Sequence, residues 1–180
     1  MELDKILRML ANETACQEAE EMALAITPDT ELTGVERHLQ ETDDAYVLTA
    51  RFGAPSFGGL CNMENALRRA QAGASLQPAE LLKIAGLLRS LRAILDWRSR
   101  SEGVSVSINW RFESIQPNKY LEEKIFTSIL NEEEIADTAS VKLASIRRKI
   151  RSASQRARDH LDKMIRSPQV VKYLQDPIVT

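Results

Sequence analysis

Apolar residues recur at every third or fourth position along most of the chain, which is the spacing of amphipathic helices. Before residue 130, this spacing predicts helices over about 3–26, 32–51, 63–73, 78–97 and 119–129. Proline marks two of their limits. Thr27-Pro28 ends the first helix, because the residue before a proline is pushed out of helical geometry, and Pro78 suits a first helical turn. Residues able to cap the second and third helices stand just before them, at Asp29 or Thr30 and at Asn62.

The longest predicted helix runs from Ser140, its expected N-cap, to about Ser167. Its apolar and small residues fall on one side and form what we call the Leu143–Met164 seam, which we expect to be buried. The seam consists of Leu143, Ile146, Ile150, Ala153, Ala157, Leu161 and Met164. At ~1.5 Å per residue the helix is about 40 Å long, so we expect part of it to project beyond the body that holds it.

The stretch from Val104 to Phe112 fits two structures. Its apolar residues alternate strictly, which indicates a strand. Ile108, Phe112 and Ile115 also recur at helical spacing, and Gln116-Pro117 would end either element. The residues themselves leave both a strand and a helix open.

The composition favours a mainly α fold. Of the 180 residues, 43% are hydrophobic and only 5% aromatic, and 7 glycines and 6 prolines are too few for the many tight turns of an all-β fold. We therefore predict a multi-helix core bundle with a long helix protruding at its C-terminal end, and little or no β structure.

Charge is distributed unevenly along the chain. The formal net charge is −2, yet nine basic residues and two acidic ones lie between Val141 and Arg166. Such segregation fits either a solvated helix face or an anionic partner, including an acidic neighbouring subunit. The cations fall off the seam and spread around the outer surface, and no aromatic residue is interleaved, so the helix suits contact with phosphates rather than reading of bases. The candidate phosphate contacts are Arg147, Arg148, Lys149, Arg151, Arg156 and Arg158.

No group of residues predicts catalysis, a cofactor or a metal site. Gly58-Gly59 lacks the spacing and the lysine of a phosphate-binding loop and fits a turn instead. His38 and His160 each stand alone on predicted helices, where surface or packing roles explain them better than metal binding. Cys61 has no base nearby in the sequence, and its pattern with Cys16 fits reduced intracellular thiols. No stretch is apolar enough to span a membrane, and we expect a cytoplasmic protein without enzymatic activity of its own.

A series of short motifs runs along nearly the whole chain: residues 3–7, Thr27-Pro28 with the Glu-rich helix after it, Pro55-Ser56-Phe57-Gly58-Gly59-Leu60, 69–73, 76–82, Asp137-Thr138-Ala139-Ser140, 143–151 and 172–180. In order and spacing the series resembles one family, the bacterial MutS paralogues of the second type. The chain departs from the family mainly in Val104 to Asn118, where Trp110 and Phe112 stand in a stretch that the family often fills with Leu, Ala and Glu. The family pattern favours a helix there.

The resemblance implies that the chain is the N-terminal core-and-lever part of such a protein. Residues 1–139 would be a helical core, 140–168 the lever helix and 169–180 the truncated start of a clamp, with a first strand beginning at Ile178-Val179-Thr180. Members of the family bind branched DNA, suppress homologous recombination and dimerise through an ATPase, and they usually carry a C-terminal Smr endonuclease domain. Some are implicated in separating collided ribosomes. The ATPase and nuclease would lie beyond Thr180, so ATP and Mg²⁺ belong to the longer protein and no cofactor is expected here.

We therefore expect a structural part that carries motion from the ATPase to a DNA-binding clamp, because a stiff helix rooted in a packed core moves as a unit. The expected partners are DNA or the ribosome, with neither a membrane nor a small-molecule substrate. The alternative is a helical interaction module that pairs with another chain through the Leu143–Met164 seam.

Overall fold

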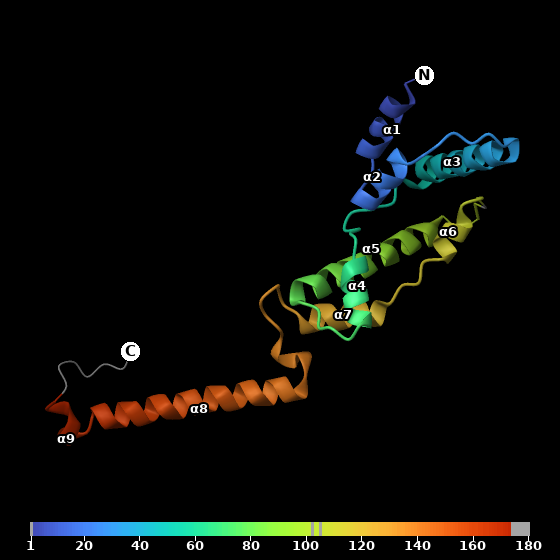
Figure 1. Ribbon diagram of the computed structural model, residues 1–180. Coiled ribbons are helices and arrows are strands. Elements are labelled where there is room, and N and C mark those ends of the chain that lie inside the picture. The colour runs from blue at the N-terminus through green and yellow to red at the C-terminus, as the bar shows by residue number, and fades with distance from the viewer. Residues whose placement is uncertain (1, 102, 105, 174–180) are drawn as a thin grey trace. The chain divides into compact units, whose positions relative to one another are not determined.

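The computed structural model describes residues 2–101, 103–104 and 106–173, and these residues form helices and loops without a strand (Figure 1). This confirms the predicted mainly α fold. None of the described helices is both long and apolar enough for a membrane span. The chain divides into two compact units, residues 1–134 and 135–180. The expected first strand of a clamp, Ile178-Val179-Thr180, lies outside the described residues, and the division into core, lever and clamp stays a prediction.

The first unit is built from helices of very different length. Its long helices are α3 (Leu32–Phe52) and α5 (Pro78–Arg100), and α7 (Lys119–Ser128) packs along α5. The shorter helices are α1 (Leu3–Asn12), α2 (Gln17–Leu24), α4 (Glu64–Gln71) and α6 (Asn109–Glu113). Every helix predicted from the spacing of apolar residues in this part of the chain is present, but the first is divided in two.

The prediction of a single helix over about 3–26 is wrong, because the chain turns between α1 and α2, which pack against each other. Thr14 closes α1: its Oγ1 donates a hydrogen bond to the carbonyl oxygen of Ala11 at 2.7 Å, and its N–H donates to the same oxygen at 3.1 Å. A Thr hydroxyl bonded to the backbone competes with continuation of the helix. Cys16 is then extended, with φ −151° and ψ 159°, and precedes α2. The turn lets α1 and α2 bury Ala11 and Ala23.

The predicted caps of the second and third helices are wrong, because the N-cap residues of α3 and α4 are Glu31 and Met63 and neither makes a side-chain cap hydrogen bond. Asp29 and Asn62 instead shape the backbone just ahead of these helices. Asp29 Oδ1 accepts from the N–H of Glu31 at 2.9 Å, just before α3. Asn62 Oδ1 accepts from the N–H of Glu64, the first residue of α4, at 2.8 Å. Both are hydrogen bonds to a backbone group two residues on, which is the turn that Asn and Asp favour.

The stretch from Val104 to Phe112, for which the sequence left a strand and a helix open, contributes residues to a hydrophobic core of the first unit. This core consists of Leu48, Trp97, Val106 and Ile108, and Val104 and Phe112 pack against it. α6 occupies Asn109–Glu113, so the helical alternative is confirmed for these residues and a strand there is wrong. Arg98 holds the turn that leads into α6, because its guanidinium donates to the carbonyl oxygen of Val104 at 2.8 Å and to Asn109 Oδ1 at 2.6 Å. No described segment pairs with these residues as a strand, so their alternating apolar side chains serve to bury one side of a turn.

The glycine-containing loop between α3 and α4 is tied to α5. Trp97 Nε1 donates to the carbonyl oxygen of Gly53 at 3.0 Å, and Ser90 Oγ donates to that of Gly58 at 2.8 Å. Gly59 has a φ of +84°, and a Cβ added there would lie 2.9 Å from Ser90 Oγ. The prediction that these glycines form a turn is confirmed, and Gly59 is required by both its backbone angle and its close approach to α5.

The second unit consists of a 3₁₀ turn over Asp137–Ala139, the long helix α8 (Val141–Ile165) and the short helix α9 (Pro168–Val171). The predicted long helix and its cap are confirmed: Ser140 Oγ accepts from the N–H of Leu143 at 3.1 Å. Pro168 begins α9, and the residue before it, Ser167, is extended.

Candidate nucleic-acid interface

The amino end of α8 is held by an acidic residue of the turn before it. Asp137 accepts from Arg147 Nη1 at 2.5 Å and from Arg151 Nη2 at 3.0 Å, one guanidinium on each carboxylate oxygen. Arg147 also donates to the carbonyl oxygen of Ile135 at 2.7 Å. The hydrogen bond from Arg147, followed by that from Arg151, lowers the pKa of Asp137 below its ordinary value. Charge-assisted hydrogen bonds and the Ser140 cap therefore both fix α8 to the preceding turn.

Two of the six predicted phosphate contacts thus already have a carboxylate partner. The Arg147 side chain is 34% exposed, whereas that of Arg151 is 68% exposed, so part of the Arg151 guanidinium still faces solvent. The others make no ion pair with any residue that the structure describes, and all are exposed: Arg148, Lys149, Arg156 and Arg158. Contact of the six with nucleic acid stays a prediction.

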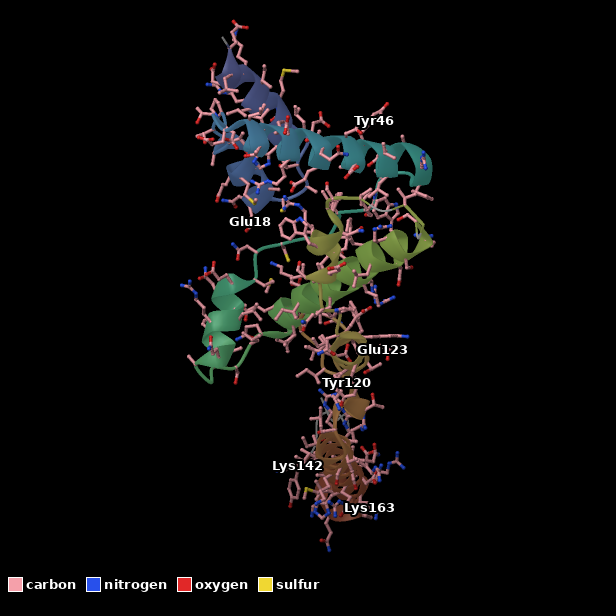
Figure 2. The ribbon with its side chains drawn as sticks, turned by 90° about the vertical axis from the view of Figure 1, so that its right-hand side faces the viewer. Glu18, Tyr46, Tyr120, Glu123, Lys142 and Lys163 are labelled. Atoms are coloured by element: carbon pink, nitrogen blue, oxygen red, sulfur yellow. The ribbon has the colours of Figure 1, made fainter. Side chains whose placement is uncertain are left out.

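Some cations of α8 are arranged more regularly than the prediction of a general spread allows. They recur every seven residues, and an α-helix places such residues on nearly the same side, because two turns take ~7.2 residues. Lys142, Lys149, Arg156 and Lys163 therefore form what we call the basic row. Figure 2 labels its two end members on α8. The predicted contacts omit both ends, Lys142 and Lys163, although their seven-residue spacing is visible in the sequence.

The Leu143–Met164 seam is exposed except at Leu143, which is half-buried, so the prediction of a buried seam is wrong for the chain by itself. α8 contains no buried residue, and Ile150 is 58% exposed. Among the described residues of this unit, the elements that pack on α8 are the 3₁₀ turn and α9. They contain 3 and 4 residues, too few to cover the apolar side of a 25-residue helix.

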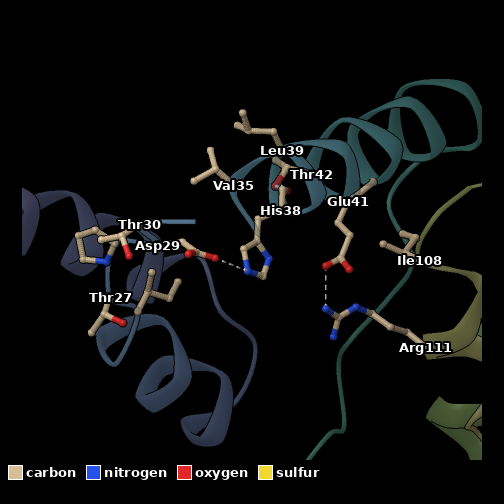
Figure 3. A pocket seen from close by; sticks show the side chains of 13 residues that line it. Thr27, Asp29, Thr30, Val35, His38, Leu39, Glu41, Thr42, Ile108 and Arg111 are labelled. Atoms are coloured by element: carbon tan, nitrogen blue, oxygen red, sulfur yellow. Dashed lines mark hydrogen bonds and ion pairs between the residues drawn. The ribbon is translucent and has the colours of Figure 1, made fainter. Parts of the chain in front are cut away.

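A second candidate surface is an open groove of about 1010 Å³ in the first unit (Figure 3). The loop after α2, one face of α3 and the turn into α6 line it, and its apolar lining includes Ile26, Val35, Leu39 and Ile108. Two pairs of polar side chains stand in its wall. His38 Nε2 lies 3.8 Å from Asp29 Oδ2, and Arg111 Nη2 donates to Glu41 Oε2 at 3.0 Å. The His38 side chain is 57% exposed, which confirms its predicted surface position.

The groove is better suited to contact than to chemistry. Glu41 and Arg111 neutralise each other, and Thr42 Oγ1 donates to the carbonyl oxygen of His38 at 2.8 Å, so this hydroxyl is engaged with the backbone. The described residues contain no group of three or more His, Cys, Asp and Glu side chains positioned to hold a metal ion. The strongly basic part of the molecule is α8, with nine basic and two acidic residues between Val141 and Arg166.

Comparison with known proteins places this chain beside part of a larger protein. No family model matches it. Curated proteins named Endonuclease MutS2 are 41% identical in Acetivibrio thermocellus, 37% in Ruminiclostridium cellulolyticum and 36% in Agathobacter rectalis. Each alignment covers 100% of this chain and 23% of the relative. The chain thus spans about a quarter of the length of the curated relatives it matches.

Proposed function

This chain belongs to the MutS2 family, and we propose that it forms the core and lever of a longer MutS2-type protein. In that protein the chain carries no reaction. It links an ATPase, which holds ATP and Mg²⁺, to a clamp that grips branched DNA. The longer protein acts as an endonuclease and as a dimer in the cytoplasm, where it restrains homologous recombination, and collided ribosomes are a second target.

The observation that carries this proposal is the construction of α8. It is a single helix of 25 residues, about 37 Å long at ~1.5 Å per residue, without an internal break. Its amino end is fixed by the Ser140 cap and by the hydrogen bonds of Arg147 and Arg151 to Asp137. An unbroken helix held at one end transmits a rotation of that end to its tip, because packed elements move as rigid bodies.

Contact with nucleic acid is the electrostatic part of the same proposal. Nine basic and two acidic residues between Val141 and Arg166 give α8 a strong positive potential. Arg148, Lys149, Arg156 and Arg158 are exposed and suit contact with phosphates, while Arg147 and Arg151 serve first to fix the helix. Phosphate contacts of this kind position a protein on DNA without reading its sequence.

The lever is tested in the full-length protein by softening α8 in its middle. Ser152 and Gln155 are exposed, and glycine at these sites makes the helix about 1 kcal/mol per site less stable than alanine does. We expect ATP hydrolysis to continue while the change in branched-DNA affinity that ATP produces becomes much smaller. Alanine at the same two positions is the matched control and should preserve the coupling. Full coupling in the glycine variant, with faster hydrogen exchange confirming a softened α8, would rule the lever out.

The exposed seam supports a second candidate, a helical interaction module that pairs through Leu143 to Met164. A monomeric soluble protein seldom leaves such an apolar row uncovered. Replacing Ile146 and Ile150 with serine should abolish association while the chain still folds. A seam that packs within its own domain predicts loss of folding instead. Sedimentation and circular dichroism of the chain and of this double variant separate the two results.

A further inference from the structure

The groove of the first unit runs beside an exposed apolar row on α3. Leu32, Leu39 and Tyr46 recur every seven residues and are 71%, 65% and 73% exposed. Val35 lies three residues after Leu32 and four before Leu39, so it shares their side of the helix. We call these four residues the α3 row, and two of them, Val35 and Leu39, line the groove (Figure 3). A row with this spacing is a surface along which a second helix can pack.

Carboxylates stand on both sides of the α3 row. Glu36 and Asp43 each come one turn after a member of the row, and both are exposed without an ion pair to any described residue. Glu41 stands on the other side, within the groove, where it shares its charge with Arg111. The chain from residue 29 to residue 46 contains a single arginine and no lysine, against these acidic residues: Asp29, Glu31, Glu36, Glu41, Asp43 and Asp44. The apolar row is therefore bordered by negative charge.

Other polar groups of the groove already have partners within the chain. The Thr42 hydroxyl donates to the carbonyl oxygen of His38 at 2.8 Å. Asp29 Oδ1 accepts from the N–H of Glu31 at 2.9 Å. A ligand therefore gains more from the apolar row and from the charge along its borders than from hydrogen bonds inside the groove.

We propose that this groove docks a basic amphipathic helix of a partner protein. The partner helix lays its apolar side on the α3 row and places lysine or arginine side chains opposite Glu36, Asp43 and Glu41. The row supplies the contact area, and the carboxylates select cations over other flanking groups. The contact goes beyond the lever and the interaction module, because α8 takes no part in it.

Charge argues against other occupants of the groove. Nucleic acid would bring phosphates against carboxylates and leave the apolar row without a matching surface. A second copy of α3 would place like charges on both flanks of one apolar contact, which disfavours pairing. A basic amphipathic helix satisfies the row and its acidic borders together.

The test uses two fluorescent synthetic helices, both with leucine at seven-residue spacing along one side. One carries lysine at the positions that flank the leucines, and the other carries glutamine there. Because α8 is strongly basic, it repels the lysine peptide, which therefore reports on the acidic groove. In an anisotropy titration of the chain we expect the lysine peptide to bind about tenfold more tightly than the glutamine peptide. Leu39→Ser should remove this binding, with circular dichroism showing that the chain remains helical.

Reversing the charges of α3 gives the decisive comparison. Glu36→Lys with Asp43→Lys should weaken binding of the lysine peptide by about tenfold and leave that of the glutamine peptide unaltered. The matched control reverses Glu132 and Glu133, which are exposed in the loop after α7. At physiological ionic strength, where distant charges are screened, the control should change neither affinity. The longer protein should bind the lysine peptide as tightly as the chain does.

Three results would overturn the proposal. The first is equal affinity for the two peptides. The second is a lysine-peptide affinity that Leu39→Ser leaves unaltered or that the control reversal lowers as much as the reversal on α3. The third is loss of binding in the longer protein, which would assign the groove to another segment of that protein. None of these results bears on the lever, because that test measures ATP-dependent DNA affinity.

Discussion

Arg92 of α5 and Glu122 of α7 form a two-bond ion pair: Nη2 donates to Oε1 at 2.8 Å and Nε donates to Oε2 at 3.0 Å. Arg89 adds a third bond, from Nε to Oε1 at 3.3 Å. The Glu122 side chain is only 4% exposed, whereas that of Arg92 is 33% exposed. A buried carboxylate is therefore compensated from the neighbouring helix, next to the shared core of Ala85, Ile125 and Ile129.

Removing this charge should destabilise the first unit. Glu122→Gln leaves an amide that accepts weaker hydrogen bonds and deprives both arginines of their carboxylate, so we expect a loss of about 1–2 kcal/mol in the free energy of unfolding. Urea denaturation followed by circular dichroism measures it. Glu123→Gln is the matched control, because Glu123 is 63% exposed and pairs with Lys119 one turn away. Equal losses in both variants would contradict the structural role of Glu122.

The same pair makes stability depend on pH. The hydrogen bond from Arg92 is the main cause that lowers the pKa of Glu122 from its ordinary value of 4.5. Because the folded pKa is the lower one, the contribution is complete above 4.5 and is lost as the pH falls through the lowered value. The difference in unfolding free energy between the wild type and Glu122→Gln should therefore shrink in acid. A difference that stays constant from neutral to strongly acidic pH would refute this linkage.

Gly59→Ala should be costly where Gly58→Ala is not. Gly59 has a φ of +84°, and its new Cβ would lie 2.9 Å from Ser90 Oγ, while at Gly58 the nearest atom, Ser56 Oγ, is 3.6 Å away. We expect about 1–2 kcal/mol of destabilisation at Gly59 and less than about 0.5 kcal/mol at Gly58. Thermal unfolding of the two variants compares them under one condition. A smaller loss at Gly59 than at Gly58 would show that the loop between α3 and α4 rearranges freely.

The helices could be predicted where their limits depend on neighbours in the sequence, as at Pro78 or at the Ser140 cap. The helices could not be predicted where a limit depends on a competing hydrogen bond. Apolar spacing continues across Thr14, whose hydroxyl donates to Ala11 and competes with continuation of α1. The structure of the segment with Val106 and Ile108 could not be predicted from its pattern for a tertiary reason. A turn that buries one side on Leu48 and Trp97 has the same alternation of apolar residues as a strand.

The candidate interface shows the same limit. Its cations could be found from composition, but their partners could not, since Asp137 reaches Arg147 and Arg151 across ten and fourteen residues by way of a 3₁₀ turn. The seam could be recognised as apolar, whereas its exposure follows from what else is present to cover it. The periodicity of apolar residues indicates that a helix has an apolar side, but it does not indicate which element packs against that side.

The cap of α8 can be tested locally. Ser140→Ala removes the acceptor of the Leu143 N–H, which should cost about 1 kcal/mol and fray the first turn. Hydrogen exchange at Leu143 and the next few amides should accelerate roughly fivefold, as expected for such a loss. Ser152→Ala, in the exposed middle of the same helix, serves as the control. Unchanged exchange at the amino end would mean that the bonds of Asp137 alone fix α8.

Neutralising the exposed cations of α8 should weaken branched-DNA binding and its dependence on salt. Changing Arg148, Lys149, Arg156 and Arg158 to glutamine removes charges that have no described ion-pair partner, so the slope of log affinity against log salt should fall by about 0.9 for each phosphate that the protein no longer neutralises. Arg147→Gln with Arg151→Gln should lower the slope less, because these two arginines already donate hydrogen bonds to Asp137. Titrations at several salt concentrations measure both slopes. Undetectable binding at low salt, or an unchanged slope in the four-residue variant, would remove nucleic-acid contact from the roles of α8.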